Sequence, residues 1–351
     1  MDKRIEVGVL GATGMVGQQF IHQLAGHPWF SLRWLAASER SEGKRYSQAA
    51  SWRLETPVPD GIADQTVESC TPGVGPRLVF SALDANVAGD IERAFADAGH
   101  FVVSNARNHR MDPSVPLLVP EVNAEHLALL RTQAKLRTGK GAIVTNPNCS
   151  TVVLTLALAP LRAFGLRSCL VSTMQAVSGA GYPGVPSLDI LGNVIPFISG
   201  EEEKIESETR KILGRFAGEA AGVELHPVAV SAHTNRVPVI DGHTETVSVK
   251  LDARPSAQEI RAAFDGFSGA PQRLGLPTAP VPPVLYLDQP NRPQPRFDAG
   301  RGRGMTVTVG RLRPCAVLDW KFVALGHNTV RGAAGAAVLN GELMAAEGWL
   351  D

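Results

Sequence analysis

One six-residue stretch, 146–151, places a cysteine where its thiol can act as a nucleophile. Its sequence is Asn-Pro-Asn-Cys-Ser-Thr, with a short β-branched run before it and a longer apolar run after it. The first run predicts a buried strand, and the second predicts a helix that starts at Ser150 or Thr151, since both are good N-cap residues. Pro147 disfavours helical geometry in the residue before it and so sharpens the turn. Cys149 is therefore expected at the N-terminal end of a helix.

The predicted position of Cys149 bears on its reactivity, because only the thiolate form of a cysteine is a nucleophile. The positive end of a helix and its free N–H groups lower the pKa of an adjacent thiol. The same N–H groups can bind the oxyanion that forms when sulfur attacks a carbonyl carbon. The alternative is a buried and inert side chain, as most lone cysteines are.

The composition limits the class of protein. A chain of 351 residues is long enough for two domains, and its 44% hydrophobic and 19% charged residues are typical of a globular protein. The 34 basic residues equal the 34 acidic ones, which gives no support for a nucleic-acid or membrane partner. Cys70, Cys149, Cys169 and Cys315 lie far apart without a CxxC pair, which predicts neither a metal site nor disulfides. Residues 1–6 lack the apolar core of a signal peptide, so we expect a cytoplasmic protein.

A glycine-rich turn follows the first predicted strand, 5–10. Gly11, Gly14 and Gly17 lie in or after this turn, and apolar residues at helical spacing come next. Strand, glycine turn and helix in this order are typical of a dinucleotide site, because glycines let the backbone turn tightly and approach a pyrophosphate. The spacing is GxxGxxG rather than GxGxxG, so an ordinary strand-to-helix turn is the alternative. The cofactor-binding residues predicted here are Gly11, Thr13, Gly14, Met15 and Val16.

The end of the second predicted strand indicates which dinucleotide is bound. An NAD site usually has an acidic residue there, whereas an NADP site has a cation and small hydroxyl groups for the 2′-phosphate. Ser38, Arg40 and Ser41 fit NADP, although Glu39 leaves NAD open and these charges could also belong to a solvated loop. NADP is the predicted cofactor, and Ser81, near the end of a later strand, is a further predicted contact.

Strands and helices alternate through the first 150 residues, which predicts an α/β protein with a doubly wound parallel sheet. The predicted elements are strands at 5–10, 32–37, 78–83, 101–103 and 142–144 and a helix at 91–98. Ligands bind such sheets at the carboxyl ends of the strands, so the loop 104–110 and the Cys149 turn should face one crevice.

The remainder of the chain predicts a second domain with an antiparallel or mixed sheet. Its predicted elements are strands at 170–177, 228–234, 244–251, 305–312 and 317–325, a polar helix at 201–213 and a small-residue helix at 327–346. The proline-rich segment 270–300 is expected to be an extended excursion at an interface.

Eight stretches, in order, resemble those of one enzyme family. They are GATGMVGQ at 11–18, AASERSEGKRY at 36–46, SNARNHR at 104–110, NPNCST at 146–151, TMQAVSGAGYPG at 173–184, EEEK at 201–204, NRVPVIDGHTE at 235–245 and GHNTVRGAAGAA at 326–337. With them the chain resembles aspartate-β-semialdehyde dehydrogenase over nearly its whole length, most closely the branch typical of archaea and fungi. One departure is visible: the family usually has a cysteine where this chain has Thr234. That cysteine is not the nucleophile, so we expect the change to be minor.

The resemblance implies a Rossmann-type domain, 1–148 with 328–351, and an α+β catalytic and dimerisation domain, 149–327, of the glyceraldehyde-3-phosphate dehydrogenase-like kind. It implies an NADP-dependent enzyme that converts L-aspartyl-4-phosphate to L-aspartate-4-semialdehyde and phosphate through a cysteine thioester. Such a step feeds lysine synthesis through diaminopimelate, and methionine and threonine synthesis. A homodimer or homotetramer is expected.

The resemblance also implies roles for individual residues. Cys149 would be the nucleophile, His243 the general acid and base, and Gln175 the residue that orients the substrate. The substrate-binding residues would be Arg236 at the α-carboxylate, Glu201 at the ammonium group, Arg110 and Lys204 at the phosphate, and Asn148. Gly179 and Asn328 would contact the cofactor. Chemistry agrees, because an arginine fork matches a carboxylate, and a histidine of pKa about 6.5 can both take a thiol proton and return one.

Two other functions stay open. A malonyl-CoA reductase of the same family would use the same cysteine, but a malonyl group has no ammonium to pair with Glu201. A non-catalytic NADP-binding protein predicts the loss of at least one of Cys149, His243 and Arg236, and all three are present.

Overall fold

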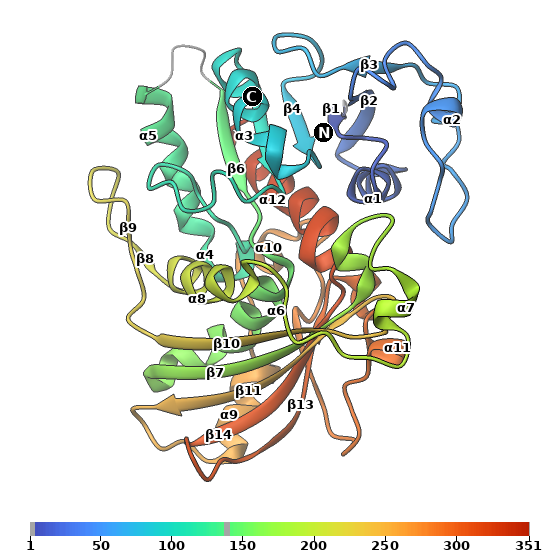
Figure 1. Cartoon of the computed structure of the whole chain (residues 1–351). Helices are drawn as coiled ribbons and strands as arrows, with labels where there is room; N and C mark the ends of the chain where they lie inside the picture. Colours follow the sequence, from blue (N-terminus) through green and yellow to red (C-terminus); the bar gives the residue numbers. More distant parts are fainter. Residues whose placement is uncertain (1–3, 137–140, 351) are drawn as a thin grey trace.

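We describe the protein from a computed structural model that covers residues 4–136 and 141–350. Residues 1–3, on which the expected absence of a signal peptide partly rests, lie outside this range. Two sheets dominate the structure, a parallel one near both chain ends and a mixed one beyond it (Figure 1). Within the described residues, none of the helices has both the length and the apolar character needed to cross a membrane.

The first sheet has the strand order β3-β2-β1-β4-β5-β6, and every pair is parallel. Its strands are β1 Ile5–Leu10, β2 Phe30–Ala37, β3 Val67–Ser69, β4 Leu78–Ser81, β5 Phe101–Ser104 and β6 Ala142–Thr145. Its helices are α1 Met15–Leu24, α2 Tyr46–Ala49, α3 Ala85–Asp97, α5 Leu129–Leu136 and, from the other end of the chain, α12 Gly335–Ala346. The order reverses beside β1, so the predicted doubly wound sheet is confirmed, and its crevice opens past the carboxyl ends of β1 and β4.

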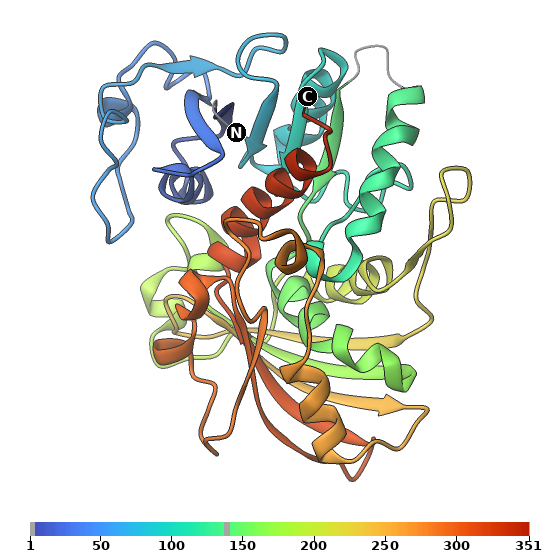
Figure 2. The same ribbon diagram turned by 180° about the vertical axis from the view of Figure 1, so that it is seen from behind.

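The C-terminal helix α12 packs against α1, β4 and β5, as the view from behind shows (Figure 2). It is apolar nearly all round and buried nearly throughout, with Val338, Leu339 and Leu343 fully inside. A helix with this pattern must be covered on all sides. The chain therefore returns to its first sheet after completing its second.

The second sheet is mixed and has the order β10-β7-β11-β14-β13-β12. Its strands are β7 Leu166–Gln175, β10 Ala229–Arg236, β11 His243–Leu251, β12 Val284–Leu287, β13 Val307–Pro314 and β14 Trp320–Gly326. Figure 2 shows α6 Cys149–Leu158 and α9 Ala257–Asp265 on one face of this sheet, whereas Figure 1 shows the other face uncovered. The two sheets lie on either side of the expected boundary at 148, but the boundary residues themselves stay a prediction.

The remaining elements are short, apart from α8. They are α4 Pro120–Asn123, α7 Ser187–Ile190, α8 Glu201–Ile212, α10 Ala270–Leu274, α11 Pro295–Asp298, the hairpin β8 Arg215–Phe216 and β9 Val223–Glu224, 3-10 helices at Ala124–Ala128, Ala159–Phe164, Val177–Ala180 and Arg301–Gly304, and a π-helix at Val330–Ala334.

Three expectations about elements were wrong. The helix predicted at 91–98 begins at Ala85, because Asp84 caps it by accepting from the Asn86 N–H at 2.9 Å. The proline-rich segment 270–300 is more than an excursion, because β12 adds a parallel strand to β13. The helix predicted at 327–346 starts with a π-helical turn at 330–334.

Candidate active site

The Cys149 turn joins β6 to α6, as predicted, but the cap is different. Asn148 is the N-cap, and its Oδ1 accepts from the N–H groups of Ser150 at 2.9 Å and Thr151 at 3.2 Å. Cys149 is therefore the first residue of the helix, and the expectation of a later start at Ser150 or Thr151 was wrong. The amides of Ser150 and Thr151 are thus already bonded to Asn148, so neither of these two is free to bind an oxyanion.

Cys149, at the start of α6, faces His243, which is the first residue of strand β11. The distance from Cys149 Sγ to His243 Nε2 is 3.2 Å. The other ring nitrogen, Nδ1, is 3.1 Å from the Ala176 N–H. A backbone N–H can only donate, so Nδ1 accepts and the neutral ring carries its proton on Nε2. His243 is therefore set to donate toward sulfur, rather than to take the thiol proton as we expected.

Burial keeps both members of the pair neutral in the unliganded site. Burial acts in the same direction as the nearby Glu201 carboxylate, and together they raise the pKa of the Cys149 thiol to about 12. Burial lowers the pKa of His243 to about 3, with the Arg236 charge adding to the effect. The expected lowering of the thiol pKa by the helix end was wrong, because desolvation and a negative neighbour outweigh it here. The resting pair is a thiol beside a neutral imidazole.

Arg236 and Gln175 lie in register on adjacent strands beside this pair. The buried Arg236 guanidinium donates from Nη1 to the Ala176 carbonyl at 2.7 Å. Gly179 packs against Arg236 and His243, since a Cβ there would lie 2.9 Å from Arg236 Nη1 and 3.1 Å from His243 Cε1. Only glycine leaves room at this point, so bare backbone reaches the site, as expected for the 178–184 loop.

Glu201, at the start of α8, is buried and makes one ion pair and two hydrogen bonds. It pairs with the ammonium of Lys204, accepts from Asn148 Nδ2 at 2.7 Å and from Gln175 Nε2 at 3.4 Å. Arg110 reaches the same region from the loop after β5. The structure thus brings all eight predicted catalytic and substrate-binding residues into one neighbourhood, with α8 linking most of them.

The predicted dinucleotide turn borders a cleft of about 540 Å³, lined among others by Thr13–Val16, Ala82–Asp84 and Tyr182. Gly11 has φ +75°, which a side chain rarely adopts, and a Cβ on Gly17 would lie 2.2 Å from the Gly11 carbonyl oxygen. Both glycines are therefore required for helix α1 to start this close to β1. These features fit a dinucleotide pyrophosphate at the helix N-terminus.

The other predicted cofactor contacts lie at two places. Ser38, Arg40 and Ser41 form the turn directly after β2, and Ser81 ends β4 at the same edge of the sheet. Asn328 is already engaged by protein, because its Oδ1 accepts from the Gly242 N–H at 2.8 Å and its Nδ2 donates to Ser178 Oγ at 2.7 Å. Asn328 thus connects the 178–184 loop to Gly242, the residue before His243.

The sequence reasoning missed a support behind the nucleophile. Arg331 and Glu121 form a fully buried two-pronged ion pair at 2.7 and 2.6 Å, which fixes the π-helical turn. The next residue, Gly332, packs against Cys149, and a Cβ there would lie 2.7 Å from Cys149 Cβ. The arginine and glycine in the stretch 326–337 were the available signal. π-Helical turns are frequent at functional sites.

We expect Gly332→Ala to displace Cys149 and lower kcat on the order of 100-fold, because a shift of about 1 Å in a reacting group has that effect. Steady-state kinetics beside the matched control Gly300→Ala measures this, since a Cβ on Gly300 meets nothing within 4 Å and its φ of -80° suits any residue. Wild-type kcat in a folded Gly332→Ala protein would show that the contact does not position the thiol.

The fold and the site together define a class of protein: an oxidoreductase with a dinucleotide-binding sheet and a cysteine–histidine pair at its carboxyl edge. Comparisons with known proteins make this specific. Residues 6–130 match the family model "Semialdehyde dehydrogenase, NAD binding domain", and 158–331 match "Semialdehyde dehydrogenase, dimerisation domain". The chain belongs to the aspartate-semialdehyde dehydrogenase family.

Relatives cover nearly the whole chain. Aspartate-semialdehyde dehydrogenase of Archaeoglobus fulgidus is 52% identical over 98% of this chain and 99% of its own length. That of Schizosaccharomyces pombe is 48% identical over 98% of both chains. The crystal structure of aspartate semialdehyde dehydrogenase with NADP from Candida albicans has a TM-score of 0.91 at 43% identity, covering 99% of this chain and 100% of that one. The predicted resemblance to the archaeal and fungal branch is confirmed.

Proposed function

We propose that the protein interconverts L-aspartyl-4-phosphate and L-aspartate-4-semialdehyde with NADP as its cofactor. The observation that carries this proposal is Cys149 Sγ at 3.2 Å from His243 Nε2, with the buried charges of Arg236 and Glu201 beside them. A substrate that needs a thiol nucleophile, a cation for a carboxylate and an anion for an ammonium group matches this arrangement.

Each end of the proposed substrate has a partner of complementary charge. The Arg236 fork suits the α-carboxylate, and Glu201 suits the α-ammonium group. Arg110 and Lys204 are cations for the phosphate, while Gln175 and Asn148 adjoin Glu201 and orient the chain between the ends.

NADP would occupy the cleft beside Gly11, with Thr13–Val16 at the pyrophosphate and the turn at Ser38–Ser41 near the adenosine ribose. Arg40 in that turn is a cation for a 2′-phosphate. Further contacts are assigned to Ser81, Gly179 and Asn328. The Candida albicans relative was crystallised with NADP. When bound, the cofactor supplies or accepts the hydride.

In the reductive direction, Cys149 sulfur attacks the acyl carbon of aspartyl phosphate. The C–S bond forms, the C–O bond to phosphate breaks, and the thiol proton leaves with the phosphate. Hydride delivery to the thioester carbon builds negative charge on its oxygen, which the Nε2–H of His243 stabilises. The C–S bond then breaks, its electron pair returns to sulfur, and the thiolate takes a proton from solvent.

Glu201 argues against the malonyl-CoA alternative, because a malonyl group leaves this buried carboxylate with no cation beyond Lys204. The Cys149–His243 contact argues against a protein that only binds NADP, since binding needs neither residue.

We further propose a cytoplasmic homodimer. One face of the mixed sheet is left uncovered in Figure 1. Leu170 on β7 is 46% exposed and alternates with the buried Cys169 and Val171, so it lies on the face opposite to theirs. The match of 158–331 to a dimerisation domain supports an assembly through this part of the chain. A homotetramer remains an alternative that sedimentation would distinguish.

The Glu201→Gln variant is expected to make Cys149 more reactive and the substrate bind more weakly. The carboxylate of Glu201 raises the thiol pKa, so removing its charge lowers that pKa and increases the thiolate fraction at a given pH. We expect alkylation of Cys149 at pH 8 to be several-fold faster, as monitored by peptide mass spectrometry. We also expect a higher KM for aspartate semialdehyde in steady-state kinetics. Slower alkylation would contradict this account, and Glu203→Gln, on another face of α8, is the matched control.

The function is tested by mixing purified protein, NADP⁺ and L-aspartate-4-semialdehyde with and without inorganic phosphate. Phosphate-dependent NADPH formation is expected. Activity with malonyl-CoA and NADPH alone would favour the family alternative, and absence of both activities would favour a binding protein.

A further inference from the structure

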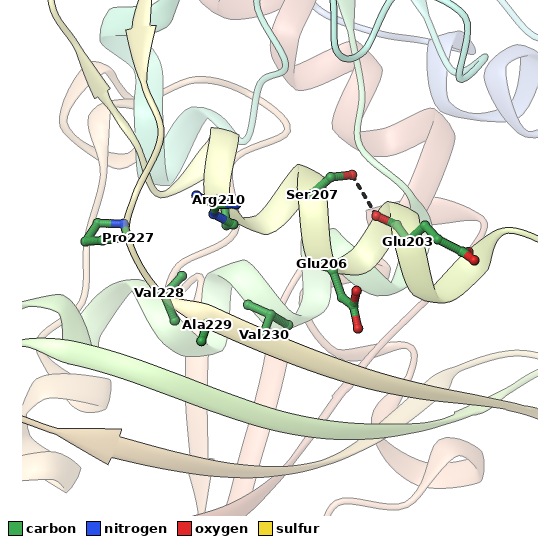
Figure 3. A pocket seen from close by; sticks show the side chains of 8 residues that line it. All are labelled: Glu203, Glu206, Ser207, Arg210, Pro227, Val228, Ala229 and Val230. Atoms are coloured by element: carbon green, nitrogen blue, oxygen red, sulfur yellow. Dashed lines mark hydrogen bonds between the residues drawn. The ribbon is translucent and has the colours of Figure 1, made fainter.

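Helix α8 presents two different charged faces. Glu201, Lys204, Glu208 and Lys211 recur every three or four residues and so share one face. The other face borders a groove of about 550 Å³ lined by Glu203, Glu206, Ser207, Arg210 and 227–230 (Figure 3). None of the predicted site residues lines that groove. On the first face, Glu201 and Lys204 already belong to the proposed substrate site. The other two charges of this face, Glu208 and Lys211, are therefore the ones to explain.

Glu208 continues that face into the protein and makes two hydrogen bonds. Its Oε1 accepts from Arg110 Nη1 at 2.9 Å, and its Oε2 accepts from the Asn148 backbone N–H at 2.6 Å. The side chain is 2% exposed. One carboxylate thus joins the proposed phosphate-binding guanidinium to the residue that precedes the nucleophile.

Arg110 makes a second hydrogen bond, to the backbone of Asn105, and has one N–H group, at Nε, that lacks a partner in the part of the chain that the structure describes. Its Nη2 donates to the Asn105 carbonyl at 2.7 Å, while its buried Nε has no hydrogen-bond partner among the described residues. A buried donor without a partner is costly, so an anion that binds here gains a strong contact. The orientation of this guanidinium is set by Glu208 and Asn105.

Lys211, one turn further along α8, holds the loop that carries Arg110. Its Nζ donates to the carbonyls of Arg110 at 2.7 Å, Asp112 at 2.8 Å and Val115 at 2.9 Å. Burial lowers its pKa to about 8. The backbone of the loop is therefore fixed by Lys211, and the side chain of Arg110 separately by Glu208.

We propose that Glu208 is a positioning residue that fixes the distance between the Arg110 phosphate contact and the Cys149 nucleophile. In an acyl phosphate a single oxygen separates the attacked carbon from phosphorus. The two sites must therefore keep their spacing closely, because about 1 Å of misplacement costs on the order of 100-fold in rate. The inference rests on the proposed function, since it assigns phosphate to Arg110.

The test separates the two half-reactions with Glu208→Gln. Glutamine keeps an oxygen for the Asn148 N–H, but its NH₂ group faces the Arg110 guanidinium and the ion pair is lost. We expect the phosphate KM to rise tenfold or more, while the phosphate-independent burst of NADPH from aspartate semialdehyde and NADP⁺ stays near the wild-type rate. Glu206→Gln is the matched control, because it removes a charge from the groove face of the same helix, where Glu206 accepts from the Ala232 N–H.

Each outcome decides the proposal. A phosphate KM that moves no more in Glu208→Gln than in Glu206→Gln overturns it, and so does an equal loss of burst and phosphate step, which indicates a purely structural carboxylate. If Glu208→Gln does not fold, Glu208→Asp keeps the charge with shorter reach and must still raise the phosphate KM selectively. Wild-type protein without any phosphate dependence would instead overturn the proposed function.

Discussion

Replacing Cys149 with serine is expected to lower kcat on the order of 10⁴-fold or more, while NADP⁺ binding is unchanged. The hydroxyl of serine is a far weaker nucleophile than a thiol, and an oxygen ester would release its alcohol less readily than a thioester releases its thiolate. The cofactor cleft is bordered by Thr13–Val16 and does not include Cys149. NADPH formation measures the first effect, and quenching of protein fluorescence by NADP⁺ measures the second.

Cys315→Ser is the matched control for this substitution. Cys315 lies in the turn between β13 and β14, where its Sγ accepts from the Leu318 N–H at 3.4 Å. Activity of this control should equal that of the wild type. Near-normal turnover by the Cys149→Ser protein would show that no covalent intermediate forms on residue 149.

The second large effect is expected at His243, and its size should depend on which ring nitrogen is imitated. The amide nitrogen of glutamine takes the place of Nε2, whereas that of asparagine takes the place of Nδ1. The imidazole stabilises the oxyanion that hydride transfer creates, and the loss of one such donor costs about 10²–10³-fold in kcat. His243→Gln should retain more activity than His243→Asn, because Nε2 carries the proton that faces Cys149 Sγ.

Single-turnover rates of thioester formation and decay test this order. Equal losses in the two variants, or a more active asparagine variant, would contradict the assignment of the proton to Nε2. His233→Asn is a suitable control, since that side chain is 84% exposed on β10.

Much of the fold followed from local pattern. Parallel strands buried on both faces are short continuous apolar runs, and β1, β4, β5 and β6 have that pattern. The strand order did not follow, because pairing is decided by packing between distant segments. The strand β12 was also missed, since prolines surround it and its partner β13 is more than 20 residues away.

The site was predicted residue by residue from the motifs, but its internal contacts were not. Residue types indicate that a cysteine and a histidine can react, whereas the Ala176 N–H that selects the histidine tautomer is a backbone group. In the sequence, Glu208 is one more charge of the polar helix predicted at 201–213, and only the fold places it against Arg110. The pKa of Cys149 depends on burial, which no local pattern reveals.

The most direct test of the covalent mechanism is a rapid-mixing experiment without phosphate. Protein, NADP⁺ and L-aspartate-4-semialdehyde should give a single burst of NADPH that stops, with one aspartyl group attached to the peptide that contains Cys149. Adding phosphate should then restore steady turnover and release the group. Continuous turnover without phosphate, or a burst that leaves Cys149 unmodified, would contradict it.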